Sequence, residues 1–366
     1  MRFLQHIEFF VRSIGQILLV YLSGGPRREA IPDWRARPYR ILFVRDDGIG
    51  DLILSMELLR AIRDASPGFT IDLLGSPQNA AFARTLPFLT DVVVHRRRGG
   101  LHEAWRTGRL LRRRRYDVVV DGRGILSNVD THTTLLLLGT GARWRIGIGG
   151  RRNDRVYTIK VDPAAPSSIG EQLAVLAQPF GVDPHQRDWR ARLPVSPAER
   201  AAAERAWTAV GVGRPRVLVN ISVGHPERYW RHERYAPVLA RLRARLPNAT
   251  IMLTAMPHEQ AVADDLARPV RGAAIPLTFS EVVATVATAD LVITPDTAIT
   301  HVASAFQTPT LALMRRNTHA WVPFQTPGKI AFGDVARRLE PGLTAERVVA
   351  VLDELITEMG PAKGWL

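Results

Sequence analysis

Short apolar runs alternate with longer segments of helical periodicity along the chain from Arg40 onward. In the first half, runs rich in β-branched residues predict strands at 41–45, 70–74, 91–95, 117–121 and 145–148. Segments 51–65 and 102–115, between these runs, carry apolar residues at helical spacing. This alternation is typical of a parallel sheet covered by helices.

A second series of the same kind starts near Arg216. It predicts strands at 217–221, 250–254, 274–277, 291–294 and 310–314, with helices at 233–246, 280–289 and 299–306. We therefore predict an α/β fold with two Rossmann-like, doubly wound domains. Ligands of parallel sheets bind beyond the carboxyl ends of the strands, so we expect the two sheets to face a deep cleft.

Segments rich in Pro and charge, 162–166 and 183–197, separate the two series and suit a hinge, with one predicted helix, 169–180, between them. We divide the chain into an amphipathic N-terminal extension (1–38), two Rossmann-like domains (39–182 and 183–340) and a C-terminal segment (341–366). The last segment contains a predicted helix over 345–359, which we expect to pack across the domains.

The N-terminal 22 residues are apolar and aromatic, but Arg2, Glu8 and Arg12 interrupt them. A transmembrane helix needs about 20 mostly apolar residues, and a signal peptide needs one short apolar run before a small-residue cleavage site. Neither pattern fits well. We expect a helix that lies on a membrane surface, because a series of arginines follows it between Arg27 and Arg40. The alternative is a helix packed on the protein's own surface.

Composition narrows the chemistry. The 366 residues include no Cys, which excludes disulfides, thiolate nucleophiles and thiolate metal sites. The net charge is +14, and nearly all cations are Arg, since Lys occurs only at Lys160, Lys329 and Lys363. Guanidinium groups match phosphate, so the candidate partners are nucleic acid, an anionic membrane or a phosphorylated substrate. Genome composition is an alternative reason for the use of Arg.

The segment from Arg45 to Asp51 follows the first predicted strand and opens the first helix. Gly48 and Gly50 permit a tight turn, but the third glycine of a dinucleotide-binding fingerprint is absent, which weakens a nicotinamide interpretation. Asp51 has two interpretations. It caps the helix N-terminus, or it is a general base that accepts a proton from a substrate hydroxyl.

Three features of the second half point to phosphate chemistry. Arg228, in the loop after strand 217–221, is the cation best placed to meet a phosphate, unless it is a solvated loop charge. The strand at 291–294 runs through Asp296 into a helix whose first amides form a phosphate cradle, with the Thr297 hydroxyl beside them. A helix with a simple Asp cap would look similar. Glu259 is a candidate to bind ribose hydroxyls. Alternatively, it interacts favourably with the dipole of its own helix from the first turn.

Taken together, these motifs resemble glycosyltransferase family nine, the lipopolysaccharide heptosyltransferases, over roughly residues 40–335. The resemblance rests on 41–45 with 48–51 and 58–63, on 228–230, on 257–259, and on 296–301 with 308–310. It implies a type B glycosyltransferase fold, a nucleotide-activated heptose donor (ADP-heptose in characterised members), inversion at the anomeric carbon and no required metal or cofactor.

The resemblance also assigns roles to single residues. It places the catalytic base at Asp51, the phosphate-binding lysine at Arg228 and the ribose-binding glutamate at Glu259. The phosphate loop falls on Asp296, Thr297 and Ala298, and the histidine of that motif on His301. This chain departs from the family pattern at two positions. Arg228 keeps the charge of the family's lysine but has a different geometry, and Ala298 replaces the family's glycine. These differences put the identity of the donor in doubt. We also expect Ser222 and Leu277 on the donor side, and Gly48, Gly50 and Arg123 on the acceptor side.

The predicted function is therefore inverting, metal-independent transfer of a sugar, with heptose the expected one, from a nucleotide-diphosphate donor to an anionic glycolipid of the lipopolysaccharide core. We expect the protein in the cytoplasm, peripheral to the inner membrane, with basic segments 96–98, 109–115 and 151–155 toward phosphorylated lipid heads. A nucleotide-sugar epimerase of the same architecture is one alternative. A basic nucleic-acid-binding protein is another, although no recognition-helix, zinc-finger or aromatic RNA-binding signature supports it.

Overall fold

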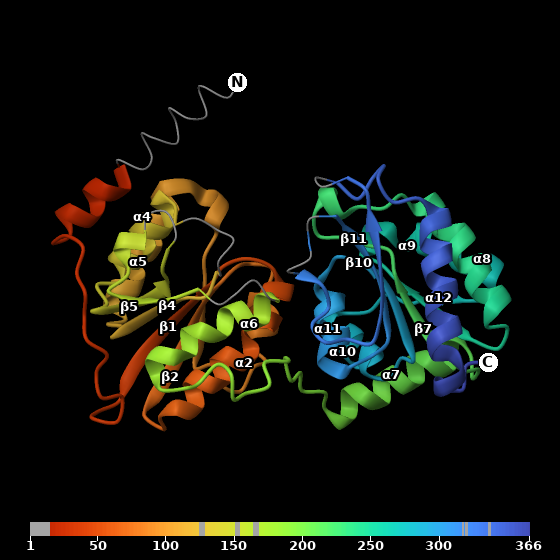
Figure 1. Ribbon diagram of the computed structural model, residues 1–366, viewed down its shortest axis with the longest axis horizontal. Coiled ribbons are helices and arrows are strands. Elements are labelled where there is room, and N and C mark those ends of the chain that lie inside the picture. The colour runs from red at the N-terminus through yellow and green to blue at the C-terminus, as the bar shows by residue number, and fades with distance from the viewer. Residues whose placement is uncertain are drawn as a thin grey trace, which may run out of the picture. The chain divides into compact units, whose positions relative to one another are not determined.

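The computed structural model describes residues 15–123, 129–150, 154–163, 168–316, 318, 321–335 and 338–366. It divides into two compact units, Met1–Trp189 (unit 1) and Arg190–Leu366 (unit 2) (Figure 1). The boundary lies a few residues after the predicted boundary between 182 and 183. Each unit holds one six-stranded sheet in which the paired strands are parallel. The predicted α/β class with two doubly wound domains is confirmed.

The sheet of unit 1 has the strand order β3-β2-β1-β4-β5-β6. Its strands are β1 (Tyr39–Arg45), β2 (Phe69–Gly75), β3 (Asp91–Val94), β4 (Val118–Asp121), β5 (Trp144–Ile148) and β6 (Ile159–Val161). Its helices are α2 (Ile49–Ala65), α3 (Ala80–Ala83), α4 (Gly100–Arg113), α5 (Thr131–Gly139) and α6 (Ile169–Ala174), and the 3₁₀ helix η3 (Val175–Phe180) follows α6. The strand order reverses between β1 and β4, so the loops after these two strands open onto the crevice where such sheets bind ligands.

Burial on both faces explains why the strands of unit 1 read as continuous apolar runs. In β1, the residues from Ile41 to Val44 are all buried. Helices α2, α6 and η3 pack together on one side of the sheet, and α4 and α5 pack together on the other (Figure 1). The predicted helix over 169–180 is α-helical only to Ala174 and 3₁₀ beyond it, with Pro179 in the 3₁₀ part.

The sheet of unit 2 repeats this topology, with the order β12-β11-β10-β7-β8-β9. Its strands are β7 (Arg216–Asn220), β8 (Thr250–Thr254), β9 (Ala273–Ala274), β10 (Leu291–Pro295), β11 (Thr310–Arg315) and β12 (Gly328–Gly333). Its helices are α7 (Pro197–Val210), α8 (Tyr235–Arg245), α9 (Gln260–Ala267), α10 (Phe279–Ala287), α11 (Ala298–Phe306) and α12 (Ala345–Lys363). The loops after β7 and β10 therefore occupy the positions that the loops after β1 and β4 occupy in unit 1.

Helix α12 contributes to the core of unit 2. It packs against α8 and β12, and Leu352 and Leu355 are fully buried in the same cluster as Leu242 of α8. Its expected packing across both domains stays a prediction. The predicted strand at 274–277 is wrong in its extent, because β9 ends at Ala274 and Pro276 has no N–H for a further ladder bond.

The N-terminal region is described from residue 15, and residues 15–22 are helical. One face of this helix packs on unit 1: the Gln16 side-chain amide donates to the Val129 carbonyl (2.9 Å), and Val20 is buried. Leu18 and Leu22 are exposed. Among the described helices, none combines the length and the apolar character that a membrane crossing demands. The predicted membrane-surface helix stays a prediction, with most of its apolar residues outside the described range.

Candidate active site

The carboxyl end of β1 is organised around a buried guanidinium group. The side chain of Arg45 is 1% exposed. Its Nε donates to the Asp51 carbonyl (3.0 Å), its Nη1 donates to the Gly122 carbonyl, and its Nη2 lies 3.3 Å from Asp51 Oδ1. Arg45 thus joins the end of β1 to the start of α2 and to the loop after β4. This arrangement fixes the position of the Asp51 backbone and carboxylate together.

Asp51 occupies the third position of α2, and Gly48, in extended conformation, is the N-cap. The Gly48 N–H donates to Asp51 Oδ2 (3.2 Å), so Asp51 stabilises the helix start from within the first turn rather than as the N-cap itself. Its side chain is still 22% exposed. Gly48 and Gly50 lie in the same turn, as predicted, and the carboxylate reaches solvent at the carboxyl edge of the sheet.

Two further carboxylates lie beside Asp51. Asp46 is buried, with Arg97 Nη1 at 3.8 Å and Arg123 Nε at 3.9 Å from its Oδ1. Asp47 Oδ1 lies 3.4 Å from Arg45 Nε. The pKa of Asp47 is raised to about 7, mainly by burial and also by the neighbouring charges of Asp51 and Asp46, while Arg45 opposes the shift. Our sequence interpretation named only Asp51, although three acids within one short turn after a strand were a visible signal.

Arg123, expected on the acceptor side, lies in the same crevice after β4. Its Nε and Nη2 donate to the two oxygens of Asp121, each at 2.8 Å, and its Nη1 donates to Thr133 Oγ1 (2.6 Å). The Tyr157 hydroxyl donates to the same carboxylate. Arg123 is 9% exposed, and its hydrogen bonds hold the loop after β4 against α5.

A pair of buried histidines lies at the end of β3. His95 Nε2 is 3.0 Å from His132 Nε2, and His95 Nδ1 is 3.0 Å from Thr107 Oγ1. Burial lowers the pKa of His95 to about 4, against the opposing effect of the Asp46 charge. The pair joins β3 to α4 and α5. The sequence gives no local sign of this contact, because the two histidines are 37 positions apart in the chain.

In unit 2, a network of neutral hydrogen bonds connects the ends of β7 and β10. Asn220 Nδ2 donates to Thr294 Oγ1 (3.0 Å) and to the Ser222 carbonyl (3.0 Å). Thr297 is the N-cap of α11, and its Oγ1 accepts the Ile299 N–H (3.2 Å). The predicted turn into a helix is therefore present. A threonine provides its cap, where the alternative interpretation expected an aspartate.

Arg228 and Asp296 lie together at this turn. Arg228 Nη1 donates to the Asp296 carbonyl (3.1 Å), and its Nε lies 3.5 Å from Asp296 Oδ2. Asp296 is buried, whereas the Arg228 side chain is 37% exposed. The guanidinium group is thus anchored to the turn before α11 at one side and open to solvent at the other. Arg228 is not an isolated, solvated loop charge.

Glu259 lies beside Ser222, another residue expected on the donor side. The Ser222 hydroxyl donates to Glu259 Oε2 and accepts the Met256 N–H (2.6 Å). His232 Nε2 lies 3.2 Å from Glu259 Oε1. Glu259 is the N-cap residue of α9 and makes no side-chain capping hydrogen bond, and its position at the helix start still suits the alternative, an interaction with the helix dipole. Our sequence interpretation missed His232.

Three remaining predicted residues lie at the same edge of this sheet. Ala298 starts α11 and is not among the described residues with positive φ, so replacement of the family's glycine brings no backbone strain. His301 is buried one turn into α11. Leu277 is half-buried in the loop after β9, two strands from β7. No cluster of three metal-ligating side chains occurs in the described part of either unit.

The basic segments divide between the two edges of the unit 1 sheet. Residues 96–98 follow β3 at the carboxyl edge, where Asp51 lies. Residues 112–115 lie between the last turn of α4 and β4, at the amino edge. The two segments therefore lie at different edges of the sheet, and their expected contact with phosphorylated lipid heads stays a prediction. Segment 151–155 lies largely outside the described residues.

The fold defines an α/β protein of two units, each with one doubly wound parallel sheet. A family model described as glycosyltransferase family 9 (heptosyltransferase) matches residues 104–337, more than half of the chain. The chain therefore belongs to glycosyltransferase family 9 and is a glycosyltransferase. None of the curated proteins is significantly similar to it in sequence.

Solved structures share the fold. The family 9 glycosyltransferase of Veillonella parvula matches with a TM-score of 0.69 and 16% identity, over 88% of this chain and 98% of the other. E. coli ADP-heptose lps heptosyltransferase II matches with a TM-score of 0.65 and 17% identity, over 88% of this chain and 99% of the other. E. coli heptosyltransferase WaaC with ADP matches with a TM-score of 0.64 and 19% identity, over 89% of this chain and 100% of the other. A UDP-N-acetylglucosamine 2-epimerase of Listeria monocytogenes, described as putative, is more distant, with a TM-score of 0.53 and 14% identity over 90% and 91%.

Proposed function

We propose that this glycosyltransferase moves a heptose from ADP-heptose to a hydroxyl of a lipopolysaccharide-core glycolipid, with inversion and without a metal. The observation that carries the proposal is the anchoring of Arg228 to the Asp296 turn at the start of α11, because it combines a cation with helix amides at the carboxyl edge of a doubly wound sheet. The ADP of the WaaC structure supports the choice of nucleotide.

The donor diphosphate is held by unit 2 in this proposal. Thr297 Oγ1 accepts the Ile299 N–H, and the Ala298 N–H is the next donor at the start of α11 for a phosphate oxygen. The exposed side of Arg228 supplies the positive charge. Glu259, oriented by Ser222, accepts hydrogen bonds from the ribose hydroxyls. Leu277 and His301 complete the donor side.

Asp51 is the general base of unit 1 in this proposal. The acceptor oxygen attacks the anomeric carbon, its proton passes to the Asp51 carboxylate, and the bond from that carbon to the diphosphate breaks. The nucleoside diphosphate then leaves with both bonding electrons. Arg228 and the α11 amides stabilise the negative charge that develops on it. The family model starts at residue 104, so the role of Asp51 rests on the motif 48–51 and on its exposed carboxylate.

The acceptor is an anionic glycolipid at the cytoplasmic face of the inner membrane in this proposal. Residues 96–98 supply cations at the carboxyl edge of unit 1, and Arg97 contacts Asp130 at 2.7 Å there. Leu18 and Leu22 expose apolar side chains on the helix over 15–22, which suits a peripheral contact with lipid.

The experiment is a transfer assay with purified protein, ADP-heptose and a deacylated core acceptor, analysed by mass spectrometry with and without EDTA. We expect a glycosylated acceptor of inverted configuration in both samples. A parallel thermal-shift series with ADP, UDP and GDP should show the largest increase in Tm with ADP. A changed sugar nucleotide without acceptor would indicate an epimerase instead. No transfer from ADP-heptose would overturn the proposal.

A further inference from the structure

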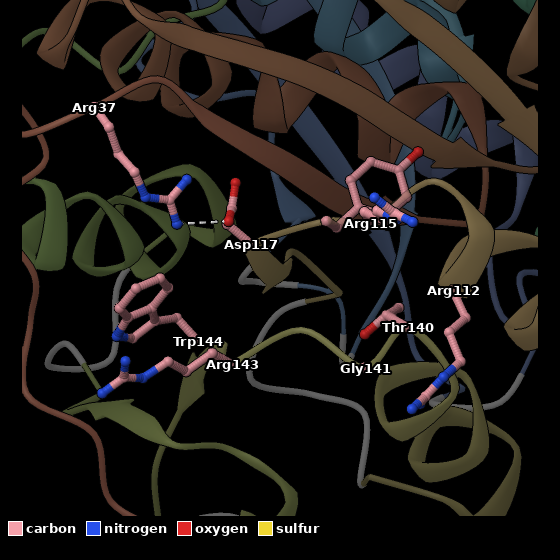
Figure 2. Close-up of a pocket in the computed structure, with 9 residues that line it drawn as sticks. Arg37, Arg112, Arg115, Asp117, Thr140, Gly141, Arg143 and Trp144 are labelled. Carbon is pink, nitrogen blue, oxygen red and sulfur yellow. Dashed lines mark hydrogen bonds and ion pairs between the residues drawn. The ribbon is translucent and has the colours of Figure 1, made fainter.

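A second concentration of arginines surrounds a cavity of about 430 Å³ at the amino edge of the unit 1 sheet (Figure 2). The cavity is lined by Arg37, Arg112, Arg115, Tyr116, Asp117, Thr140, Gly141, Arg143 and Trp144. We call it the amino-edge pocket. Its volume lies within the range of small-molecule sites.

The parallel sheet explains why distant segments meet in this pocket. Arg37 precedes β1, Arg115 precedes β4 and Arg143 precedes β5, and the amino ends of neighbouring parallel strands lie at one edge. Asp51 follows the opposite end of β1. That strand has seven residues, and at about 3.3 Å per residue its ends are roughly 20 Å apart. The pocket is therefore separate from the proposed site of transfer.

The four guanidinium groups of the pocket differ in their partners. Arg37 Nη2 lies 2.7 Å from Asp117 Oδ1, and Arg143 pairs with Glu29 (2.9 Å) while its guanidinium lies 5.0 Å from the centre of the Trp144 ring. Within the described residues, no carboxylate lies within ion-pair distance of Arg112 or Arg115. The pocket thus holds two exposed cations that have no ion-pair partner among the described residues.

The backbone brings these two arginines close together. Arg115 has a left-handed backbone (φ 54°), and its N–H donates to the Arg112 carbonyl (3.2 Å). Gly141 also has positive φ (70°), and a Cβ there would lie 3.0 Å from Arg112 Nη1. The Arg112 guanidinium therefore lies against the Gly141 backbone, where the positive φ favours glycine.

We propose that the amino-edge pocket binds a phosphate group of a ligand other than the sugar donor, through Arg112 and Arg115. Guanidinium groups bind phosphate in bidentate geometry, and these two cations match the two negative charges of a phosphomonoester. Arg37 and Arg143, held by their carboxylates, shape the opposite side of the pocket. This binding is independent of the proposed transfer reaction.

The phosphate has two possible sources, a free phosphorylated metabolite and a lipid headgroup. Helix α4 favours the lipid source. Leu101 and Trp105, four residues apart and both more than half exposed, share a helix face with Arg112. The Arg109 guanidinium lies over the Trp105 ring at 4.8 Å. Exposed Leu and Trp among arginines are typical of a helix at a membrane surface.

The test compares the wild type with R112Q/R115Q, in the full chain and with saturating ADP in every sample. The matched control is R200Q/R205Q, which removes two exposed arginines from α7 in unit 2. Calorimetry measures the binding of pyrophosphate, and co-sedimentation measures binding to phosphatidylcholine vesicles with and without phosphatidic acid. Because each charge-assisted contact is strong, we expect R112Q/R115Q to weaken at least one of these interactions by about tenfold or more.

Each outcome has one meaning. Loss of pyrophosphate binding supports a pocket that free phosphates enter, and loss confined to phosphatidic acid vesicles supports the lipid headgroup. Wild-type affinity of R112Q/R115Q for both probes, with an unchanged Tm, overturns the proposal. R228Q, which lacks the proposed donor cation, should bind both probes like the wild type, so failure of the donor site and failure of the pocket are distinguishable. The single variant R115Q replaces the double variant if the double variant has a lowered Tm.

Discussion

The two units have the same strand order but opposite chemistry at their carboxyl edges. At the edge of unit 1, the buried Arg45 and Arg123 are surrounded by carboxylates, and His95 is buried nearby. At the edge of unit 2, the hydrogen bonds between β7 and β10 join amide and hydroxyl groups, and the charged pairs Arg228–Asp296 and His232–Glu259 lie toward the border. The topology therefore determines where a site forms, and the loop residues determine its charge.

This difference predicts different responses to pH and substitution. Buried charges are stable only while their partners are ionised and in place, because an uncompensated charge in a protein interior is costly. A network of neutral hydrogen bonds has no such dependence on pH. Unit 1 should thus be the unit whose stability and activity respond to protonation, and unit 2 the one that responds to the nucleotide.

The largest effect that we expect follows from Asp51→Asn. The amide oxygen of Asn still accepts the Gly48 N–H, so α2 keeps its start, but the proposed base is lost. Transfer should fall by about 10²–10⁴ in kcat, as for the loss of other general bases. The measurement is kcat and KM with ADP-heptose and acceptor. Asp64→Asn, at an exposed position of the same helix, is the control. Turnover of D51N close to that of D64N would remove Asp51 from the mechanism.

The next effect concerns His95. Its pKa is lowered from 6.5 to about 4, so the folded protein keeps it neutral while the unfolded chain takes up a proton. This stabilisation is complete above pH 6.5 and is lost as the pH falls from 6.5 toward 4. The loss amounts to at most about 3 kcal/mol. Urea unfolding at pH 7.5 and at pH 4.5 measures it.

Two variants sharpen this test. His95→Gln removes the titrating group, so its free energy of unfolding should change less between the two pH values than that of the wild type. His185→Gln, at an exposed loop position of the same unit, should behave like the wild type. The same pH dependence in H95Q and wild type would show that other groups cause the acid sensitivity.

Arg228→Gln should weaken ADP binding by about 10- to 100-fold, because it removes a charge-assisted contact to phosphate. Arg228→Lys should keep part of the affinity, since it restores the charge but not the planar geometry. Calorimetric titration with ADP measures both variants. Arg231→Gln, an exposed neighbour in the same loop, is the control. Equal Kd values for R228Q and R231Q would place the diphosphate elsewhere.

The sequence predicted most of the fold because buried parallel strands are continuous apolar runs. All five strands predicted in each half exist, although β9 is shorter than expected. Strands β6 and β12 were missed, because the first has three residues and the second starts with Gly328 and Lys329, a poor strand signal.

The candidate site could be predicted only where chemistry follows a strand directly. Asp51 and Asp296 follow β1 and β10, so their positions were visible in the sequence. The contact of His95 with His132, and that of His232 with Glu259, join segments far apart in the chain. Tertiary packing alone brings these groups together, and no periodicity or spacing reports it.

The smallest effect that we expect follows from Asp47→Asn. Burial raises the pKa of Asp47 to about 7, so the folded state favours its protonated form; this stabilisation is present at low pH and is lost as the pH rises through 7. A neutral amide has no such dependence, so D47N should be more stable than the wild type at pH 8 and similar to it at pH 5. Because 34% of the side chain is exposed, solvent screening limits the gain to about 1 kcal/mol, or about 2–4 °C in Tm. Differential scanning calorimetry at both pH values measures it, with Asp64→Asn as the control. An equal Tm difference at pH 5 and pH 8 would mean that Asp47 does not change its protonation state between them, and would contradict the raised pKa.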